Sequence, residues 1–147
     1  MPLTHHLLPR ARVDPIDGAG PALAMFDLLI DRPLRDQTLA LLLDRGRCGL
    51  GALVVDGTCQ PDSVVDVATM LAEASPTNPG LRAVVLATVR SAACCAPATR
   101  ECLADVDRWM DVSNVFCRSG VELLEWFVVG ASHAWCPRDL LGEPPRW

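Results

Sequence analysis

The sequence predicts an α+β domain in a three-layer α/β/α arrangement, in which helices flank a mixed and largely antiparallel sheet. Two apolar runs at residues 38–43 and 49–56, joined by a polar connector that contains glycine, predict an antiparallel hairpin. A third apolar run at residues 83–89 is followed by a loop, a segment of helical periodicity and a fourth run at residues 122–130. This order of strand, loop, helix and strand organises the rest of the chain.

The chain begins with a predicted tail and a short helix. Prolines and glycines interrupt residues 1–20, which predicts a flexible N-terminal tail. Residues 21–31 predict a helix, because Pro21 suits a first helical turn and the following residues supply an apolar face. Pro33 ends this helix. We therefore place the main domain at residues 21–130.

The hairpin and the helix after it carry local signals of their own. Gly49 and Gly51 predict a bulge or a close approach of two backbones in the second strand. Ser63, followed three residues later by Asp66, resembles a capping box and predicts a helix over residues 64–74. The expected core face of that helix consists of Val64, Val67, Ala68 and Leu71.

The third strand and the helix after it are the clearest elements in the sequence. Residues 83–87 read AVVLA, a continuous apolar run that is typical of a strand covered on both faces. Asp105 and Asp107 are expected in the first turns of the helix, where the helix dipole favours negative charge. Gly120 is placed to end this helix. The residues near its helical repeat are Leu103, Val106, Met110 and Cys117, with Trp109, Val112 and Phe116 alongside.

Residues 131–147 form a C-terminal extension of a different character. A short edge strand is expected at residues 131–135, and prolines prevent long regular structure after it. The segment is too apolar for an ordinary frayed tail, so we expect it to pack on the domain or on a partner, with the domain favoured. Trp135, Arg146 and Trp147 are the best candidates for a partner contact, because tryptophan and arginine are enriched at interface hot spots.

Composition and charge exclude several classes of protein. The chain has 147 residues, enough for one domain with its own core, and a net charge of −5. It contains no lysine and no basic stripe along the sequence, which argues against a general nucleic-acid-binding protein. No apolar run approaches the ~20 residues that span a bilayer, and the start of the chain is not a convincing secretory signal. Seven cysteines, an odd number, then favour reduced thiols in a cytoplasmic protein.

The middle of the chain resembles a known family. The order of strand, loop, helix, glycine and a final strand that reads VELLEWFVVG is similar to the core of the RadC family, in the JAB/MPN (JAMM) metalloprotease-like superfamily. The resemblance covers roughly residues 38–130 and implies the cytidine deaminase-like architecture of that superfamily. In RadC-like proteins the first strand ends in Ala-His-Asn-His-Pro, and the helix opens near a Ser-x-x-Asp whose aspartate binds the metal.

This sequence departs from the family pattern at the metal site. Thr88 and Arg90 occupy the positions of the two histidines. Cys102 stands where the family has its serine, and Asp105 matches the metal-binding aspartate. Arginine is a permanent cation and cannot bind a metal. A guanidinium beside Asp105 would instead replace the charge of the metal with an ion pair, unless Arg90 is only a solvated residue at a strand end.

The leading hypothesis is therefore a RadC-like domain that has lost its metal site. Such a pseudoenzyme would be catalytically inactive and would need no cofactor. It would act as a protein-binding or assembly module, through a protein partner or through self-association, with no membrane or nucleic acid involved.

Two other functions remain open. A metal-dependent hydrolase of the isopeptidase or protease type would need a rebuilt zinc site, for which the candidates are Cys94, Cys95, Cys102 and Asp105. His133 and Cys136 form a second fragment with metal-ligand spacing. A thiol redox sensor would use the adjacent Cys94 and Cys95. Replacing Cys102 with alanine separates the hydrolase from the inactive module, because only a hydrolase would lose metal and activity.

Overall fold

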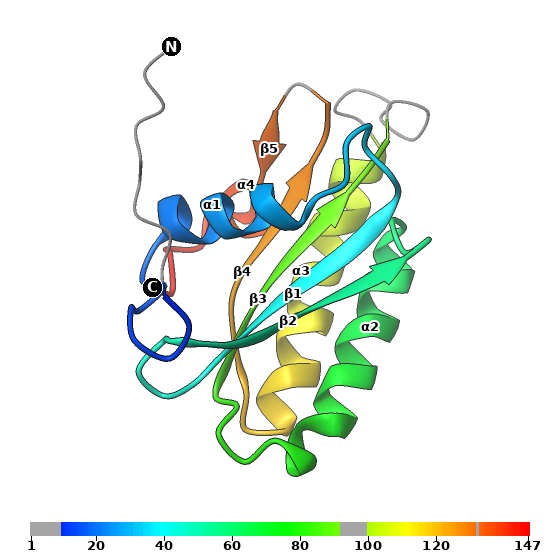
Figure 1. The fold of residues 1–147 in the computed structure, drawn as a ribbon. Helices are drawn as coiled ribbons and strands as arrows, with labels where there is room; N and C mark the ends of the chain where they lie inside the picture. Colours follow the sequence, from blue (N-terminus) through cyan, green and yellow to red (C-terminus); the bar gives the residue numbers. More distant parts are fainter. Residues whose placement is uncertain (1–9, 92–99, 132) are drawn as a thin grey trace.

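A five-stranded sheet in the order β2-β1-β3-β4-β5 forms the middle layer of the protein (Figure 1). The structure is a computed structural model that describes residues 10–91, 100–131 and 133–147. β1 pairs antiparallel with β2 and β3, β3 pairs parallel with β4, and β4 pairs antiparallel with β5. The sheet is therefore mixed and largely antiparallel, as the sequence predicts. The strands are β1 (Gln37–Leu43), β2 (Gly49–Asp56), β3 (Ala83–Val89), β4 (Glu122–Val129) and β5 (Ala134–Trp135).

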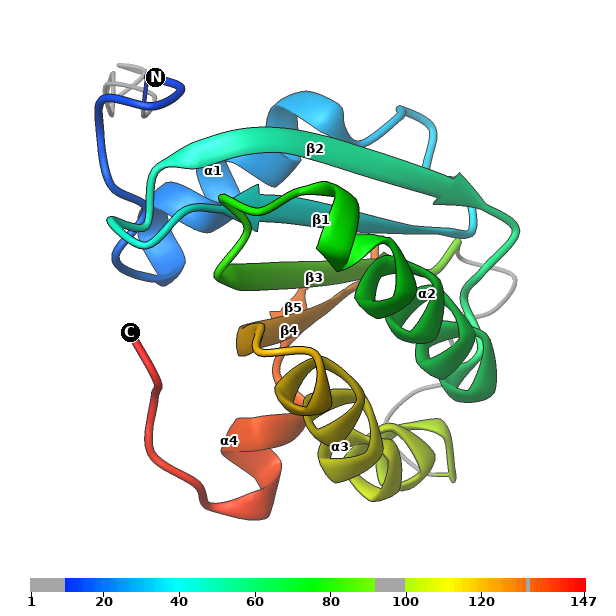
Figure 2. The same ribbon diagram turned by 90° about the horizontal axis from the view of Figure 1, so that it is seen from below.

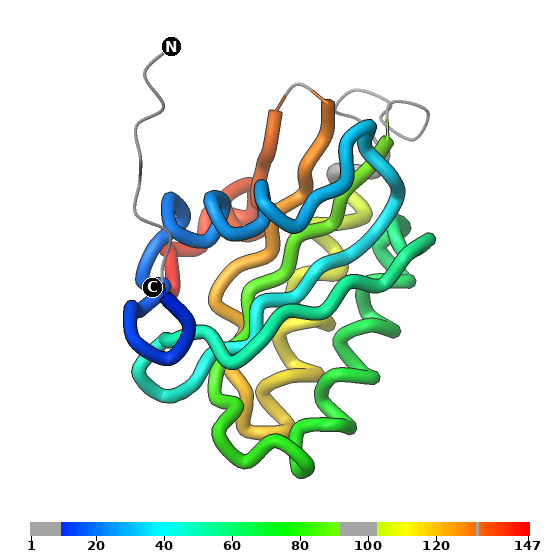
Figure 3. Tube along the Cα trace, in the orientation of Figure 1, coloured from blue at the N-terminus to red at the C-terminus, as the bar shows by residue number. Residues whose placement is uncertain are grey.

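Helices cover both faces of this sheet and give three layers. Figure 2 shows α1 on one face, and α2 and α3 side by side on the other, with α4 next to α3. The chain runs from β3 into α3 and back into β4, a path that Figure 3 traces and that makes these two strands parallel neighbours. The predicted α/β/α arrangement is confirmed. The helices are α1 (Ala19–Leu29), α2 (Pro61–Ala74), the 3-10 helix η1 (Ser75–Thr77), α3 (Arg100–Arg118) and α4 (Pro137–Leu141).

Each face of the sheet has its own hydrophobic core. On the α1 face, Phe26 packs edge to face on Phe127 with ring centroids 6.3 Å apart. On the α2 and α3 face, the fully buried rings of Trp109, Phe116 and Trp126 form the centre. Burial of such aromatic side chains dominates the energy of a core. β3 lies between the two cores and is buried along its whole length, as its continuous apolar run predicts.

Two helices, α1 and α2, begin earlier than the sequence predicts, and α1 begins at Ala19 rather than at residue 21. α2 begins at Pro61, and its N-cap residue Gln60 makes no side-chain capping bond. Ser63 therefore lies inside the helix, and the predicted capping box is wrong. Proline at the first helical position has a preset φ and needs no hydrogen-bond acceptor, which explains the earlier start. α3 begins at Arg100, so Asp105 lies in its second turn, within the first turns in which the sequence places it.

The buried side of α3 also differs from the prediction. Trp109, Val112 and Phe116 are fully buried, whereas Leu103 and Met110 are exposed by 66% and 43%. The predicted helical repeat therefore lies on the solvent side, and the residues expected alongside it form the core contact. Only one side of α3 packs against the sheet. The stripe that contains the large aromatic rings lies on that side and is buried.

Both ends of the described chain pack on the domain. Ile16, inside the segment predicted as a tail, is only 2% exposed, and its backbone N–H donates to the carbonyl of Arg47 at 2.8 Å. Trp147 contacts the core on the α1 face, and Trp135 contacts the other core. Within the described residues, no helix has the length and hydrophobicity that a membrane span needs.

Candidate functional site

The carboxyl ends of the parallel strands β3 and β4 form the candidate site. In open sheets, ligands bind beyond the carboxyl ends of parallel strands. Arg90 follows β3 directly, and its backbone N–H donates to the carbonyl of Val129 at 2.9 Å, which fixes its position beside β4. The second turn of α3 brings Asp105 to the same place.

Arg90 and Asp105 form a buried bidentate ion pair. Arg90 Nη1 donates to Asp105 Oδ2 and Nη2 donates to Oδ1, each at 2.6 Å. Arg90 is 4% exposed and Asp105 is 0% exposed. Arg90 Nε also donates to the carbonyl of Cys59 at 3.0 Å, so the guanidinium joins β3, α3 and the segment before α2. The ion pair suggested by the sequence is present, and the alternative of a solvated Arg90 is wrong.

Thr88 serves as a buried hydrogen-bond junction between three strands. Its hydroxyl lies 3.2 Å from that of Thr38 on β1 and accepts a bond of 3.0 Å from Nε1 of Trp126 on β4. Thr38 in turn donates to the carbonyl of Thr58. The buried indole N–H therefore has a partner, as buried polar groups normally do.

The described residues of this site do not fit a zinc ion. Zinc needs thiolate, neutral imidazole or carboxylate donors. Thr88 supplies only a hydroxyl, Arg90 is a cation, and both oxygens of Asp105 accept bonds from that cation. In the described part of the chain, no group of three His, Cys, Asp or Glu side chains is placed to hold a metal. Of the residues proposed for a rebuilt site, Cys94 and Cys95 lie outside the described residues, and the side chain of Cys102 is not described.

A second buried ion pair joins the middle of β4 to α4. Arg138 on α4 donates through Nε to Oε2 of Glu125 at 2.8 Å, and the exposed fractions of the two residues are 7% and 2%. Oε1 of Glu125 accepts the backbone N–H of Trp126 at 3.1 Å. Arg138 also donates to the carbonyl of Glu143. The sequence contained a usable signal, because a glutamate inside a buried strand requires a buried partner.

The nearby thiol of Cys136 is protonated at neutral pH. Burial, followed by the negative charge of Glu125, raises the pKa of Cys136 from 9.0 to about 12. Thiolate is the reactive and metal-binding form of cysteine, so this thiol is a poor nucleophile and a poor ligand. His133, its neighbour in the predicted fragment, is exposed. These properties favour a structural role for Cys136.

The C-terminal extension contacts α3 through charged and aromatic side chains. Nε1 of Trp109 donates to Oε2 of Glu143 at 2.9 Å. The guanidinium of Arg146 lies 4.9 Å from the centre of the Trp109 ring, and its Nη1 donates to the hydroxyl of Ser113 at 2.7 Å. The extension thus packs on its own domain. A partner contact by Trp135, Arg146 and Trp147 stays a prediction.

No protein-family model and no curated protein matches the chain. The resemblance to RadC-like proteins therefore depends on the pattern of the chain itself, and chiefly on the order of β3, α3 and β4 and the residues at their ends.

Proposed function

We propose that this protein is a RadC-like, JAB/MPN-related domain whose metal site has been replaced by an ion pair and which serves as an assembly module. The observation that carries the proposal is the bidentate contact between Arg90 and Asp105. In the alignment with RadC-like proteins, Asp105 takes the place of the metal-binding aspartate and Arg90 that of a histidine. One fixed positive charge thus lies where the family would hold a metal.

The ion pair has a structural consequence that suits a non-catalytic domain. A buried carboxylate without a cation would be strongly destabilising, because desolvation penalises the charge. The guanidinium of Arg90 supplies that cation and also bonds the carbonyl of Cys59. It therefore holds together the elements that surround the site and leaves no carboxylate oxygen of Asp105 without a donor.

A surface suited to assembly lies at the other side of the sheet, where β2 is the edge strand (Figure 1). In an antiparallel ladder, every second residue of a strand forms backbone hydrogen bonds with the neighbouring strand. Gly57 N–H donates to the carbonyl of Asp36, and this bond shows which residues of β2 direct their backbone groups toward β1. It follows that the backbone N–H and C=O groups of Ala52, Val54 and Asp56 point away from β1. The side chains of these three residues are exposed.

Among the residues that the structure describes, nothing gives this edge the usual protection against pairing with another chain. Edge strands are commonly protected by lysine, proline or inward-pointing charges. β2 reads GLGALVVD and has one charge, at its last residue. In the described chain, a bond from Arg12 N–H to the carbonyl of Gly49 covers only the start of the strand. We therefore propose that β2 pairs with another strand.

A second copy of the chain is the occupant that we propose. Antiparallel pairing centred on Val54 would set Val54 against the partner's Val54, and Asp56 against the partner's Ala52. The two carboxylates would then lie at opposite ends of the new ladder, where they do not repel each other. The two sheets would then join into one.

Replacing Val54 with proline is expected to convert a dimer into a monomer. Proline removes the outward N–H at the centre of the edge and leaves the bonds from β2 to β1 in place, because the N–H of Val54 does not take part in them. Size-exclusion chromatography with light scattering measures the molar mass.

The matched control is Val54→Thr, which keeps the backbone N–H and the branched side chain and is expected to remain a dimer. A monomeric wild-type protein at micromolar concentration, or a Val54→Pro variant that is still a dimer, would contradict self-association through β2.

A further inference from the structure

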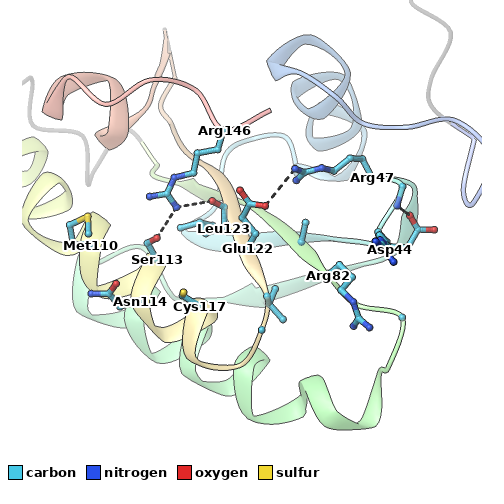
Figure 4. Close-up of a pocket in the computed structure, with 16 residues that line it drawn as sticks. Asp44, Arg47, Arg82, Met110, Ser113, Asn114, Cys117, Glu122, Leu123 and Arg146 are labelled. Carbon is cyan, nitrogen blue, oxygen red and sulfur yellow. Dashed lines mark hydrogen bonds and ion pairs between the residues drawn. The ribbon is translucent and has the colours of Figure 1, made fainter.

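A cavity lies at the end of the sheet opposite to Arg90 and Asp105. Its volume is about 950 Å³, which is within the range of small-molecule sites. Figure 4 shows its walls, which come from the turn between β1 and β2, the start of β4, the C-terminal half of α3 and the C-terminal extension. These elements lie far apart in the sequence, so no local pattern predicts the cavity.

The lining of this cavity is positively charged in an acidic protein. The chain carries a net charge of −5, yet four arginines and only two carboxylates line the cavity. The arginines come from three separate segments, which are the turn between β1 and β2, the residue before β3 and the C-terminal extension. This separation explains why no basic stripe is visible along the chain. The arginines are Arg45, Arg47, Arg82 and Arg146, and the carboxylates are Asp44 and Glu122.

The two carboxylates do not satisfy the arginines. Oδ1 of Asp44 accepts the backbone N–H groups of Gly46 and Cys48 at 2.8 and 3.0 Å, so this carboxylate stabilises the turn. Glu122 reaches Arg47 only at 3.5 Å, and its side chain is 51% exposed. A surface pair with this geometry contributes little.

Arg47 gives the clearest indication that this cavity binds a ligand. Within the described residues, its Nη1 atom is buried and has no hydrogen-bond partner. Leaving such a donor unpaired is unfavourable, because it has lost its water and gained nothing in return. The backbone of Arg47 has φ +67°, a conformation that is uncommon for residues other than glycine and that clusters at functional sites.

Other residues that line the same cavity offer further groups for an anion. Arg82 is exposed, and the bonds that it makes to the carbonyls of Pro79 and Leu81 use only its Nη1 atom. Ser113 and Asn114 offer neutral polar groups from α3. The carbon atoms of a ligand would meet apolar lining from Met110, Val121 and Leu123.

We propose that this cavity binds a small organic anion that carries a phosphate group or at least two carboxylates, with Arg47 and Arg82 as its guanidinium donors. Guanidinium groups match the oxygen pairs of phosphate and carboxylate with two parallel bonds. Both arginine side chains line the cavity and are at least partly exposed, Arg47 by 29%, and would present their guanidinium groups to an anionic oxygen there. This inference is independent of pairing through β2 and of the ion pair at the end of β3.

Isothermal titration calorimetry at constant ionic strength tests the proposal. Pyrophosphate represents the phosphate class and citrate the polycarboxylate class. We expect one binding site per chain for at least one of them, and the tighter probe identifies the class. Arg47→Gln and Arg82→Gln are each expected to weaken binding by about tenfold or more, since each removes charged hydrogen bonds. Arg108→Gln is the matched control, because Arg108 is a partly exposed arginine on α3 that does not line the cavity.

A second measurement localises the site. Cys117 is exposed and lines the cavity, so a bound anion should slow its alkylation by a neutral maleimide, as followed by peptide mass spectrometry. The proposal is wrong if neither probe binds at millimolar concentration. It is also wrong if binding survives unchanged in both Arg47→Gln and Arg82→Gln, or if Arg108→Gln weakens it equally.

Discussion

Replacing Asp105 with alanine is expected to lower the free energy of unfolding by about 3–5 kcal/mol, because it leaves the guanidinium of Arg90 buried without its counterion. Arg90 is only 4% exposed and Asp105 is fully buried, so water cannot take over the role of the carboxylate without opening the structure. The loss would be a large share of the stability of an ordinary domain, which is about 5–15 kcal/mol. Urea denaturation followed by circular dichroism gives the value.

Two control variants show that this effect belongs to the buried pair. Asp62→Ala removes the carboxylate that Arg108 contacts on the surface, where the Asp62 side chain is 81% exposed, and it should leave stability nearly unchanged. The double variant Arg90→Met with Asp105→Leu replaces both charges by apolar groups and should be far more stable than Asp105→Ala alone. If Asp105→Ala is no less stable than Asp62→Ala, the ion pair does not stabilise the fold.

Replacing Glu125 with alanine is the second change with a large expected effect, again a loss of about 3–5 kcal/mol. The variant would leave the buried guanidinium of Arg138 without a counterion, and it would remove the acceptor for the backbone N–H of Trp126. α4 and the residues after it, all part of the C-terminal extension, depend on the same arginine, which donates to the carbonyl of Glu143. Their release should change the fluorescence of Trp109, whose indole N–H donates to Glu143.

Glu122→Ala is the matched control, because Glu122 is a glutamate on the same strand whose side chain is 51% exposed. It should unfold close to the wild-type midpoint. A Glu125→Ala variant with that same midpoint and an unchanged tryptophan spectrum would show that the pair with Arg138 is not formed in solution.

Local rules correctly predicted the strands, because both faces of the sheet are covered and the apolar runs end at turns. The bounds of β2 agree with the prediction, and β1 and β4 differ from it by one residue. Gly120 ends α3 as expected, with φ +74° that glycine adopts without strain. The register of β1 and β2 also shifts next to Gly49 and Gly51, which confirms the predicted bulge.

The ion pair at the end of β3 was within reach of sequence reasoning, because the resemblance to RadC-like proteins implies that an arginine and an aspartate take neighbouring positions. The rest of the site was not. The buried stripe of α3 was misplaced, since periodicity cannot tell which of two adjacent apolar stripes meets the sheet. The contacts of Thr88 with Thr38 and Trp126 join three strands, and α4 depends on a pair between Arg138 and Glu125. The glutamate inside the buried strand β4 indicates that Glu125 has a buried partner, but local sequence does not identify the partner in any of these long-range contacts.

The most direct test of the central claim is the metal content of untagged protein, purified under reducing conditions without chelator and measured by elemental analysis. Our account predicts a folded protein with no stoichiometric zinc, because the guanidinium of Arg90 takes both oxygens of Asp105. About one zinc per chain would contradict it. That result would favour a hydrolase with a rebuilt site, and Cys94, Cys95, Cys102 and Asp105 would then be the residues to replace.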